Sequence, residues 1–375
     1  MKRLLIAGDF FPSSKDASYF ETGEINRLFD DRVIDLFRNA DFSIVNLEGV
    51  LTTEDIPQKK IGPIIKASPK ILGTLCKLRV SSVSLANNHI TDFQAKGVGD
   101  TIKALEDVGI HHIGASVDLD TRNNSLSIKL DEKSVGIYNV SETFFNTPYV
   151  NVYDEYVVCN EIRNLKSQND YVIVIYHGGA ERCQYPSPQV RKRFHRMVDS
   201  GADFITAQHT HCIGCEEYYK DSYLLYGQGN FFFSRMNQSY AHLGLVSELI
   251  FDGGIVSIKH HFVEVSENGQ LIYSPQQDFS EFKHRSAILK NRGEEDLYME
   301  YIRANTKLKE DYLLAFRGNT FESRLMIKLF PHKYKNIIEK KFSREQYLRV
   351  LLALQSDRTG ENVLSMWKNL IEKYV

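Results

Sequence analysis

Two histidines separated by one residue are the first candidates for chemistry in this chain. They are His209 and His211, in the stretch ITAQHTHCIG at 205–214. Two imidazoles at this spacing on a loop can point the same way and bind a divalent metal, although a buried turn explains the pair equally well. Cys212 and Cys215 follow as C-x-x-C, without a second Cys or His pair at zinc-finger spacing. We interpret these cysteines as small buried residues, rather than as a zinc knuckle or a redox pair.

Polar side chains also stand at the ends of four other apolar segments. Each one alone is more often a turn residue, a helix cap or a half-buried histidine than a ligand. In an open α/β sheet, however, ligands bind at the carboxyl ends of the strands, so five such ends predict convergence on one site. Carboxylate, amide and imidazole groups together suit manganese, iron or zinc. The residues concerned are Asp9, Asn46, Glu48, Asn87, Asn88, His89, His177, His209 and His211.

Strands and helices that would position these residues alternate along the chain to about residue 230. Amphipathic segments at 22–40 and 99–109 predict helices, and the alternation predicts a layered α/β fold. A hairpin is expected over 241–275, with turns at DGG (252–254) and ENGQ (267–270). Short runs rich in Val, Ile, Leu and Tyr predict strands at 3–8, 42–47, 80–86, 135–140, 171–177, 203–209 and 222–227.

The composition is that of an ordinary globular protein. Of 375 residues, 42% are hydrophobic and 25% are charged, which argues against disorder. The 46 basic and 48 acidic residues give a net charge of −2, so we expect no nucleic-acid binding. The opening MKRLLIAGDFFP has an apolar run too short for a signal peptide, and no run approaches the ~20 residues of a transmembrane segment. Five sparse cysteines do not make a disulfide framework, and we expect a cytoplasmic protein.

The C-terminal part of the sequence is charged and helical in pattern. Basic and apolar residues interleave at 324–350, which would fit a membrane surface or an acidic partner. We favour a helical cap that packs on the preceding domain. The predicted division is therefore a domain at 1–278 and a helical appendage at 279–375. Helices of the appendage are expected at 294–316, 343–355 and 360–375.

Six short motifs occur in an order that resembles a known family. Read from the N-terminus, they are GD, NLEG, LANNHITD, HGGAE, QHTH and YGQGNFFF. They resemble the poly-gamma-glutamate capsule synthesis (CapA-like) family of the calcineurin-like metallophosphoesterase superfamily, over roughly residues 1–235. The resemblance implies a four-layer α/β/β/α sandwich, in which helices cover the outer faces of two packed sheets.

The resemblance also implies a set of metal ligands in which Glu48 is shared between two ions. Phe11 stands where the superfamily has a further histidine ligand, two residues after the first aspartate. We therefore expect one firmly bound and one labile divalent ion, of manganese, iron or zinc. The implied ligands are Asp9, Glu48 and His211 for the labile ion, and Glu48, Asn88, His177 and His209 for the firm one.

Other residues are expected around the ligands. The resemblance implies that His89 gives a proton to the leaving group. Lys59, Lys60 and Lys66 could face an acidic substrate, but a solvated loop is the favoured interpretation. Six polar residues are expected to contact substrate or support the ligands: Asn46, Asn87, Asp92, Glu181, Arg182 and Asn230.

These expectations together describe a metal-dependent hydrolase. Activated water would attack a phosphoester or a gamma-glutamyl amide, in the metabolism of a capsule or another surface polymer. The substrate would be a small molecule or an anionic polymer, and the C-terminal helices could contact a capsule-synthesis partner. Two alternatives are open: a non-catalytic accessory protein of a capsule or surface-polymer synthase, and a general small-molecule phosphoesterase.

Overall fold

The computed structural model describes most of the chain up to residue 299. By its internal contacts the chain divides into a first unit, Met1–Tyr298, and a second unit, Met299–Val375. The helices expected at 343–355 and 360–375, and most of that at 294–316, lie outside the described residues. The described residues are 1–12, 16–60, 63–118, 123–142, 148–233, 242–275, 277–293 and 295–299.

The first unit contains two large β-sheets. The first sheet has eight strands in the order β16 (Leu271–Tyr273), β15 (Ile255–Val265), β14 (Leu243–Asp252), β1 (Lys2–Phe11), β2 (Phe42–Leu47), β5 (Ser82–Ser84) and β6 (His111–Ile113), with β13 (Asn230–Phe233) also paired to β1. The second sheet has six, in the order β11 (Glu216–Tyr219), β12 (Ser222–Leu225), β10 (Phe204–Gln208), β9 (Tyr171–His177), β8 (Lys133–Ser141) and β7 (Ser125–Leu130). A short pair, β3 (Val50–Leu51) and β4 (Lys66–Ala67), lies apart.

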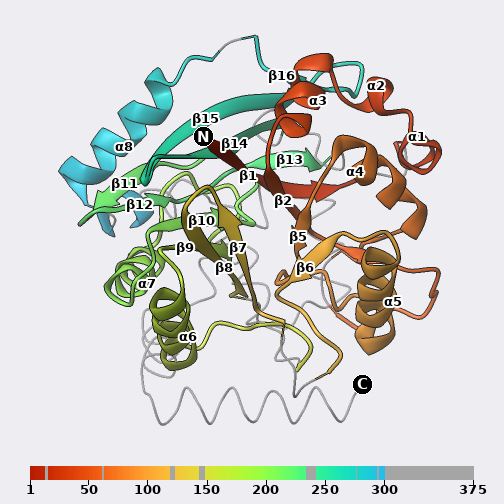
Figure 1. Ribbon diagram of the computed structural model, residues 1–375, viewed down its shortest axis with the longest axis horizontal. Coiled ribbons are helices and arrows are strands. Elements are labelled where there is room, and N and C mark those ends of the chain that lie inside the picture. Colours follow the sequence, from red (N-terminus) through yellow and green to blue (C-terminus); the bar gives the residue numbers. More distant parts are fainter. Residues whose placement is uncertain are drawn as a thin grey trace, which may run out of the picture. The chain divides into compact units, whose positions relative to one another are not determined.

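Helices cover the outer face of each sheet (Figure 1). One apolar core contains the inward residues of both sheets, and each outer face has a core of its own with the helices. The expected four-layer α/β/β/α sandwich is therefore confirmed. The first sheet is covered by α1 (Ala17–Thr22), α2 (Ile25–Leu28), α3 (Asp31–Arg38), α4 (Leu72–Leu78) and α5 (Gln94–Asp107), and the second by α6 (Glu155–Gln168) and α7 (Pro188–Asp199).

The side chains of the central strand β1 pack alternately in two different layers of the fold. Successive side chains of a strand point to opposite faces. Leu4 and Ile6 lie in the core between the sheets, whereas Leu5 and Ala7 lie in the core beneath the helices. All four are fully buried. A strand buried on both faces reads as a continuous apolar run, and this is why LLIA lacks the alternation of an exposed sheet.

The helix expected over 22–40 is wrong in detail, because three short helices occupy this region. Gly23 adopts a left-handed φ of 70° and ends α1, a conformation that glycine tolerates best. Asp30 then begins a new helix, since its side chain accepts a hydrogen bond from the amide of Val33 at 2.8 Å. The helix expected over 99–109 begins earlier, at Gln94.

The expected hairpin is present at one edge of the first sheet. Strands β14 and β15 pair antiparallel around Gly253 and Gly254, both at positive φ, and β16 adds the outermost strand. Helix α8 (Ser280–Arg292) follows and places Phe282 and Leu289 in the cores of the first unit. The domain boundary at residue 278 stays a prediction. No helix among the described residues is long and apolar enough to cross a membrane.

Candidate metal centre

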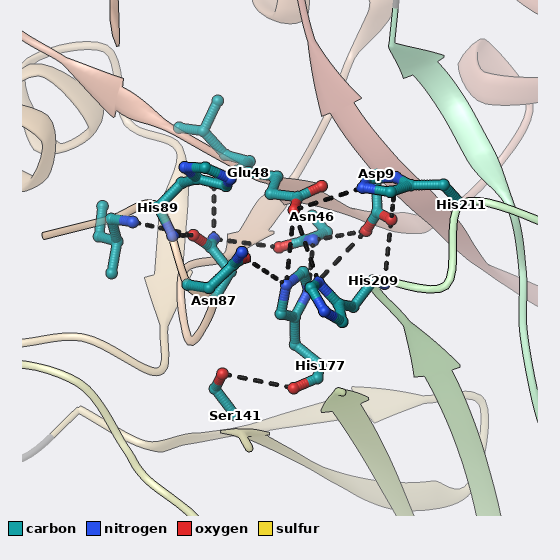
Figure 2. A network of polar contacts seen from close by, with 12 residues as sticks. Asp9, Asn46, Glu48, Asn87, His89, Ser141, His177, His209 and His211 are labelled. Atoms are coloured by element: carbon teal, nitrogen blue, oxygen red, sulfur yellow. Dashed lines mark hydrogen bonds and ion pairs between the residues drawn. The ribbon is translucent and has the colours of Figure 1, made fainter. Parts of the chain in front are cut away.

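The two sheets bring their polar strand ends to one place. Strands β1, β2 and β5 are parallel neighbours, as are β9 and β10, so their carboxyl ends lie at the same edge of each sheet. Asp9 pairs in register with Asn46 on one side and Asn230 on the other. Figure 2 shows one polar network formed by Asp9, Asn46, Glu48, Asn87, His89, His177, His209 and His211.

Two groups of side chains in this network have the geometry of metal ligands. One group is Glu48, His177 and His209, the other is Asp9, Glu48 and His211, and within each the ligand atoms lie within 4.8 Å of one another. Glu48 belongs to both. Its Oε1 atom is 3.6 Å from His177 Nε2, 4.0 Å from His209 Nδ1 and 3.9 Å from His211 Nε2. A shared carboxylate of this kind can bridge two divalent cations.

Three polar atoms at the centre of the network lack hydrogen-bond partners among the described residues. They are both carboxylate oxygens of Glu48 and the Nδ1 atom of His209. Buried polar atoms are almost always satisfied, and an unpaired buried carboxylate is costly. The nearest side chains to Glu48 Oε1 are three imidazoles at 3.6–4.0 Å, beyond hydrogen-bonding distance, and a cation between these groups would satisfy them all. The donor set therefore fits a divalent metal.

The two groups differ in the number of ligands they offer. Asn88 Oδ1 lies 2.9 Å from His177 Nε2, so a fourth donor is close to the group with His209. At the other group, Phe11 is buried with its ring against Gly49, where an added Cβ would lie 2.1 Å from the ring. Position 11 thus offers no metal ligand, and the group of Asp9, Glu48 and His211 has three ligands.

Burial and mutual charge set the protonation of the ligands. Burial and the neighbouring His209 hold the pKa of His177 well below its ordinary value, so that the ring is neutral, as metal binding requires. Burial acts to raise the pKa of Asp9, but the hydrogen bond and charge of His211 outweigh it and hold the value at about 2. Burial also acts to lower the pKa of His211, and the charge of Glu48 and the bond to Asp9 raise it to about 10.

The loop with the two histidines has an unusual backbone. His209 has φ of 87° and His211 has φ of 53°, a left-handed region that non-glycine residues seldom adopt. Each such residue costs about 1–3 kcal/mol and persists where the surroundings impose it, most often at functional sites. Here the amide of His209 donates to Asp9 Oδ2 at 3.0 Å, which holds the loop against the strand end.

Three asparagines lie in the hydrogen-bond network around the candidate ligands. Asn46 Nδ2 donates to Asp9 Oδ1 at 2.7 Å, and Asn87 Nδ2 donates to Asn46 Oδ1 at 3.3 Å. Asn230 Oδ1 lies 2.9 Å from the Nδ1 atom of His211. These amides fix the orientation of the groups that would face a metal.

His89 lies beside the ligands and has two partners of opposite charge. Its Nδ1 atom is 2.9 Å from Asp92 Oδ2 and 3.2 Å from Lys60 Nζ. The solvated position favoured for Lys60 is wrong, because its side chain is only 3% exposed and forms an ion pair with Asp92. The lysine-rich loop gave no sequence signal for this, since the partner lies 32 positions later.

The remaining expected residues lie at the edge of the network. Glu181 and Arg182 are exposed, and the amide of Arg182 donates to the carbonyl of Thr210 at 2.8 Å, so their loop runs beside the two histidines. Cys212 and Cys215 are free and buried, as expected. Burial raises the pKa of the Cys212 thiol to about 12.

Glu142 is a supporting residue that the sequence reading missed. It follows β8 directly, and its Oε2 atom accepts from the amide of Gly179 at 3.1 Å and from the Tyr176 hydroxyl at 2.8 Å. It therefore braces the loop after His177. The available signal was its place at a sixth strand end, in the motif VSE.

Two solved structures are distant likenesses of the chain. A hypothetical protein from Thermus thermophilus matches with a TM-score of 0.47 and 15% identity, over 70% of this chain and 99% of that one. A phosphatase from Mycoplasma pneumoniae matches with a TM-score of 0.42 and 14% identity, over 75% of this chain and 98% of that one. Neither likeness bears on activity.

Comparison with curated proteins gives closer relatives. The capsule biosynthesis protein CapA of Bacillus anthracis is 28% identical over 212 residues, 53% of this chain and 52% of that protein. A probable polyglutamine synthesis accessory protein of Mycobacterium tuberculosis is 27% identical over 211 residues, 51% of this chain and 55% of that protein. The chain thus spans about half the length of the curated relatives that it matches.

The family model described as bacterial capsule synthesis protein PGA_cap matches residues 3–235. This range contains the candidate ligands from Asp9 to His211 and confirms the CapA-like resemblance of the six motifs. The chain therefore belongs to the bacterial capsule synthesis protein family.

Proposed function

We propose that the chain is a metal-dependent hydrolase with one or two divalent ions, of manganese, iron or zinc, at the network around Glu48. The observation that carries the proposal is the Glu48 carboxylate, whose two oxygens accept no hydrogen bond from the described residues and lie buried between three imidazoles. A purely structural carboxylate in this position would be expected to have hydrogen-bond donors.

Each of the two ions would have its own group of ligands. Glu48 would contribute to both, because its Oε1 atom lies at comparable distances from all three histidines. The group with four donors would bind the firm ion, and the group beside Phe11, with three, the labile one. The expected ligands are Glu48, Asn88, His177 and His209 in the first case, and Asp9, Glu48 and His211 in the second.

The residues of the chain would divide the chemistry between them. Bound divalent ions supply Lewis acidity that makes water a nucleophile at neutral pH. Asp9, Asn46 and the loop of His209 hold the ligands rigid, so that the attacked bond is met in one orientation. His89, buried beside Asn88, would give a proton to the leaving group from Nε2, since Nδ1 faces Asp92.

The family suggests the class of substrate. Relatives of the chain are named for capsule and poly-gamma-glutamate biosynthesis. A gamma-glutamyl amide or a phosphoester in such a polymer, or in a small precursor, is the bond that we propose. A general phosphoesterase would differ in cleaving small phosphate esters without a preference for glutamyl compounds.

A set of model substrates tests the proposal. We expect the manganese-loaded chain to hydrolyse p-nitrophenyl and phenyl phosphodiesters or a gamma-glutamyl peptide. His89→Ala should slow the phenyl ester about 10²-fold or more, because its leaving group needs a proton, and should affect the p-nitrophenyl ester far less. His111→Ala, at an exposed histidine, is the control. If His89→Ala lost turnover by the same factor on both esters, relative to the wild type, the role of His89 would be refuted.

The second candidate is a non-catalytic accessory protein of a polymer synthase. One relative is named an accessory protein of polyglutamine synthesis, and the chain covers only half of it. In this case residues 299–375 would contact the synthesis partner. Deletion from residue 299 spares α8, which packs on the first unit, and should abolish polymer production in the host while leaving metal binding intact. Production that survives the deletion would exclude docking by this segment.

A further inference from the structure

Lys60 carries one of the most deeply buried ammonium groups among the described residues. Its side chain is 3% exposed, although it comes from a loop rich in polar residues. A buried ammonium must be paired and hydrogen-bonded to persist. The Nζ atom forms an ion pair with Asp92 Oδ1, and it lies 3.4 Å from the carbonyl oxygen of Asn88 and 3.2 Å from His89 Nδ1.

Asp92 is the link between this lysine and the proposed proton donor. Its carboxylate is fully buried, with Oδ1 against Lys60 and Oδ2 against His89 Nδ1 at 2.9 Å. The amide of Ile65 also donates to Oδ2, at 2.7 Å. Both oxygens are thus committed, one to the ammonium and one to the imidazole, and the ring can meet the carboxylate only from one side.

The loop that carries Lys60 is fastened to the same turn. The amide of Gln58 donates to the carbonyl of Asp92 at 2.8 Å, and Ile65 bonds to its side chain. Lys60 therefore sits between two backbone anchors. Its ammonium touches the backbone of Asn88, a proposed ligand, and the ring of His89, which follows it directly.

We propose that Lys60 is a positioning residue for His89. It does not touch the substrate. By occupying Asp92 Oδ1, it confines the imidazole to Oδ2 and leaves Nε2 as the nitrogen that faces the reacting group. Without the ammonium, the buried carboxylate has one unpaired oxygen and can turn toward other donors, so that the ring loses its fixed direction. The catalytic consequence rests on the proposed hydrolase function, whereas the position of the ring does not.

The matched test compares Lys60→Met with Lys59→Met. Both changes remove one positive charge from the same loop and keep an unbranched side chain, but Lys59 is exposed. Ring nitrogens are observed by NMR on metal-free protein labelled with ¹⁵N-histidine, and the His89 signals are assigned by their loss in His89→Gln. We expect Lys60→Met to shift and broaden the His89 signals. The His89 signals of Lys59→Met should superimpose on those of the wild type. Unchanged His89 signals in Lys60→Met would overturn the proposal.

A second variant and a kinetic measurement complete the test. If Lys60→Met does not fold, Lys60→Leu, which also removes the donor to Asp92 Oδ1, should show the same shift. Failure of both variants to fold would overturn the proposal, because Lys60 would then serve folding. In manganese-loaded protein, Lys60→Met should lower kcat on the phenyl ester on the order of 10-fold with KM unchanged, and hardly affect the p-nitrophenyl ester. Equal losses on both esters would contradict positioning of the proton donor. A wild-type chain without turnover would refute the hydrolase function, and the NMR result would still decide on Lys60.

Discussion

Glu48→Gln is the substitution that best distinguishes a metal centre from a buried polar network that binds no metal. The change keeps the shape of the side chain and removes its charge and one strong ligand oxygen. Both candidate ligand groups include Glu48, so the variant should lose both ions, whereas a change at His211 affects only one group. The expected order of bound metal is therefore wild type, then His211→Gln, then Glu48→Gln with none.

The size of the effect follows from linkage. A metal present at a hundredfold excess over its Kd stabilises the folded state by about 2.7 kcal/mol per site. For a unit that ends at residue 298, each kcal/mol corresponds to about 2 °C in Tm. One firm site should therefore raise the Tm of the wild type by about 5 °C, and Glu48→Gln should show no rise. Without metal, the variant should lose no hydrogen bond, because the Glu48 oxygens accept none from the described residues, but it should lose the attraction between the Glu48 carboxylate and His211.

The assay is thermal unfolding in EDTA and in manganese, with bound metal counted by mass spectrometry. Glu267→Gln, at an exposed acid in the turn before β16, controls for the loss of one negative charge. A Glu48→Gln chain with the metal content and the manganese-induced Tm rise of the wild type would refute the reasoning.

Three further predictions concern other parts of the first unit. Cys212→Ser and Cys215→Ser should keep the metal content of the wild type, because both thiols are buried and free, and a loss of metal would show that they are ligands. Burial acts to raise the pKa of Glu217, but hydrogen bonds from His195, Arg191 and Tyr226, together with the charge of Arg191, lower it from 4.5 to about 2. The stabilisation by Glu217 is therefore present above pH 4.5 and lost as the pH falls toward 2. With allowance for solvent screening, Glu217→Gln should lower the free energy of unfolding at pH 7 by about 1–2 kcal/mol and flatten its decline in that window, and urea titrations at several pH values that parallel the wild type would contradict this. Gly8→Ala should destabilise the chain by about 1–3 kcal/mol, because the added Cβ would lie 2.1 Å from a backbone oxygen of the neighbouring segment, and an unchanged Tm would refute the close approach.

Much of the sandwich could be predicted because its strands are short, apolar and bounded by polar residues. The run LLIA shows the limit of such a prediction. It marks a buried strand, but only the structure shows that Leu4 and Ile6 face the second sheet while Leu5 and Ala7 face the helices. The single helix expected at 22–40 failed for a local reason, since Gly23 and Asp30 each end or begin a helix.

The candidate ligands could be found because strand ends in such a fold converge. His177 and Asn88 are 89 positions apart, yet their ligand atoms lie 2.9 Å from each other. Lys60 could not be placed in the same way. Nothing in its own loop distinguishes it from Lys59. Its burial depends on Asp92, which follows only after the chain has passed through β4, α4 and β5.

Diffraction from crystals soaked in manganese and phosphate tests the central claim most directly. Anomalous scattering locates the metal independently of any assay for activity. We expect a strong peak between Glu48, His177 and His209 and a weaker one between Glu48, Asp9 and His211, with about 3.5–4 Å between them. The absence of any anomalous peak next to Glu48 at saturating manganese would contradict a metal-dependent hydrolase at this site.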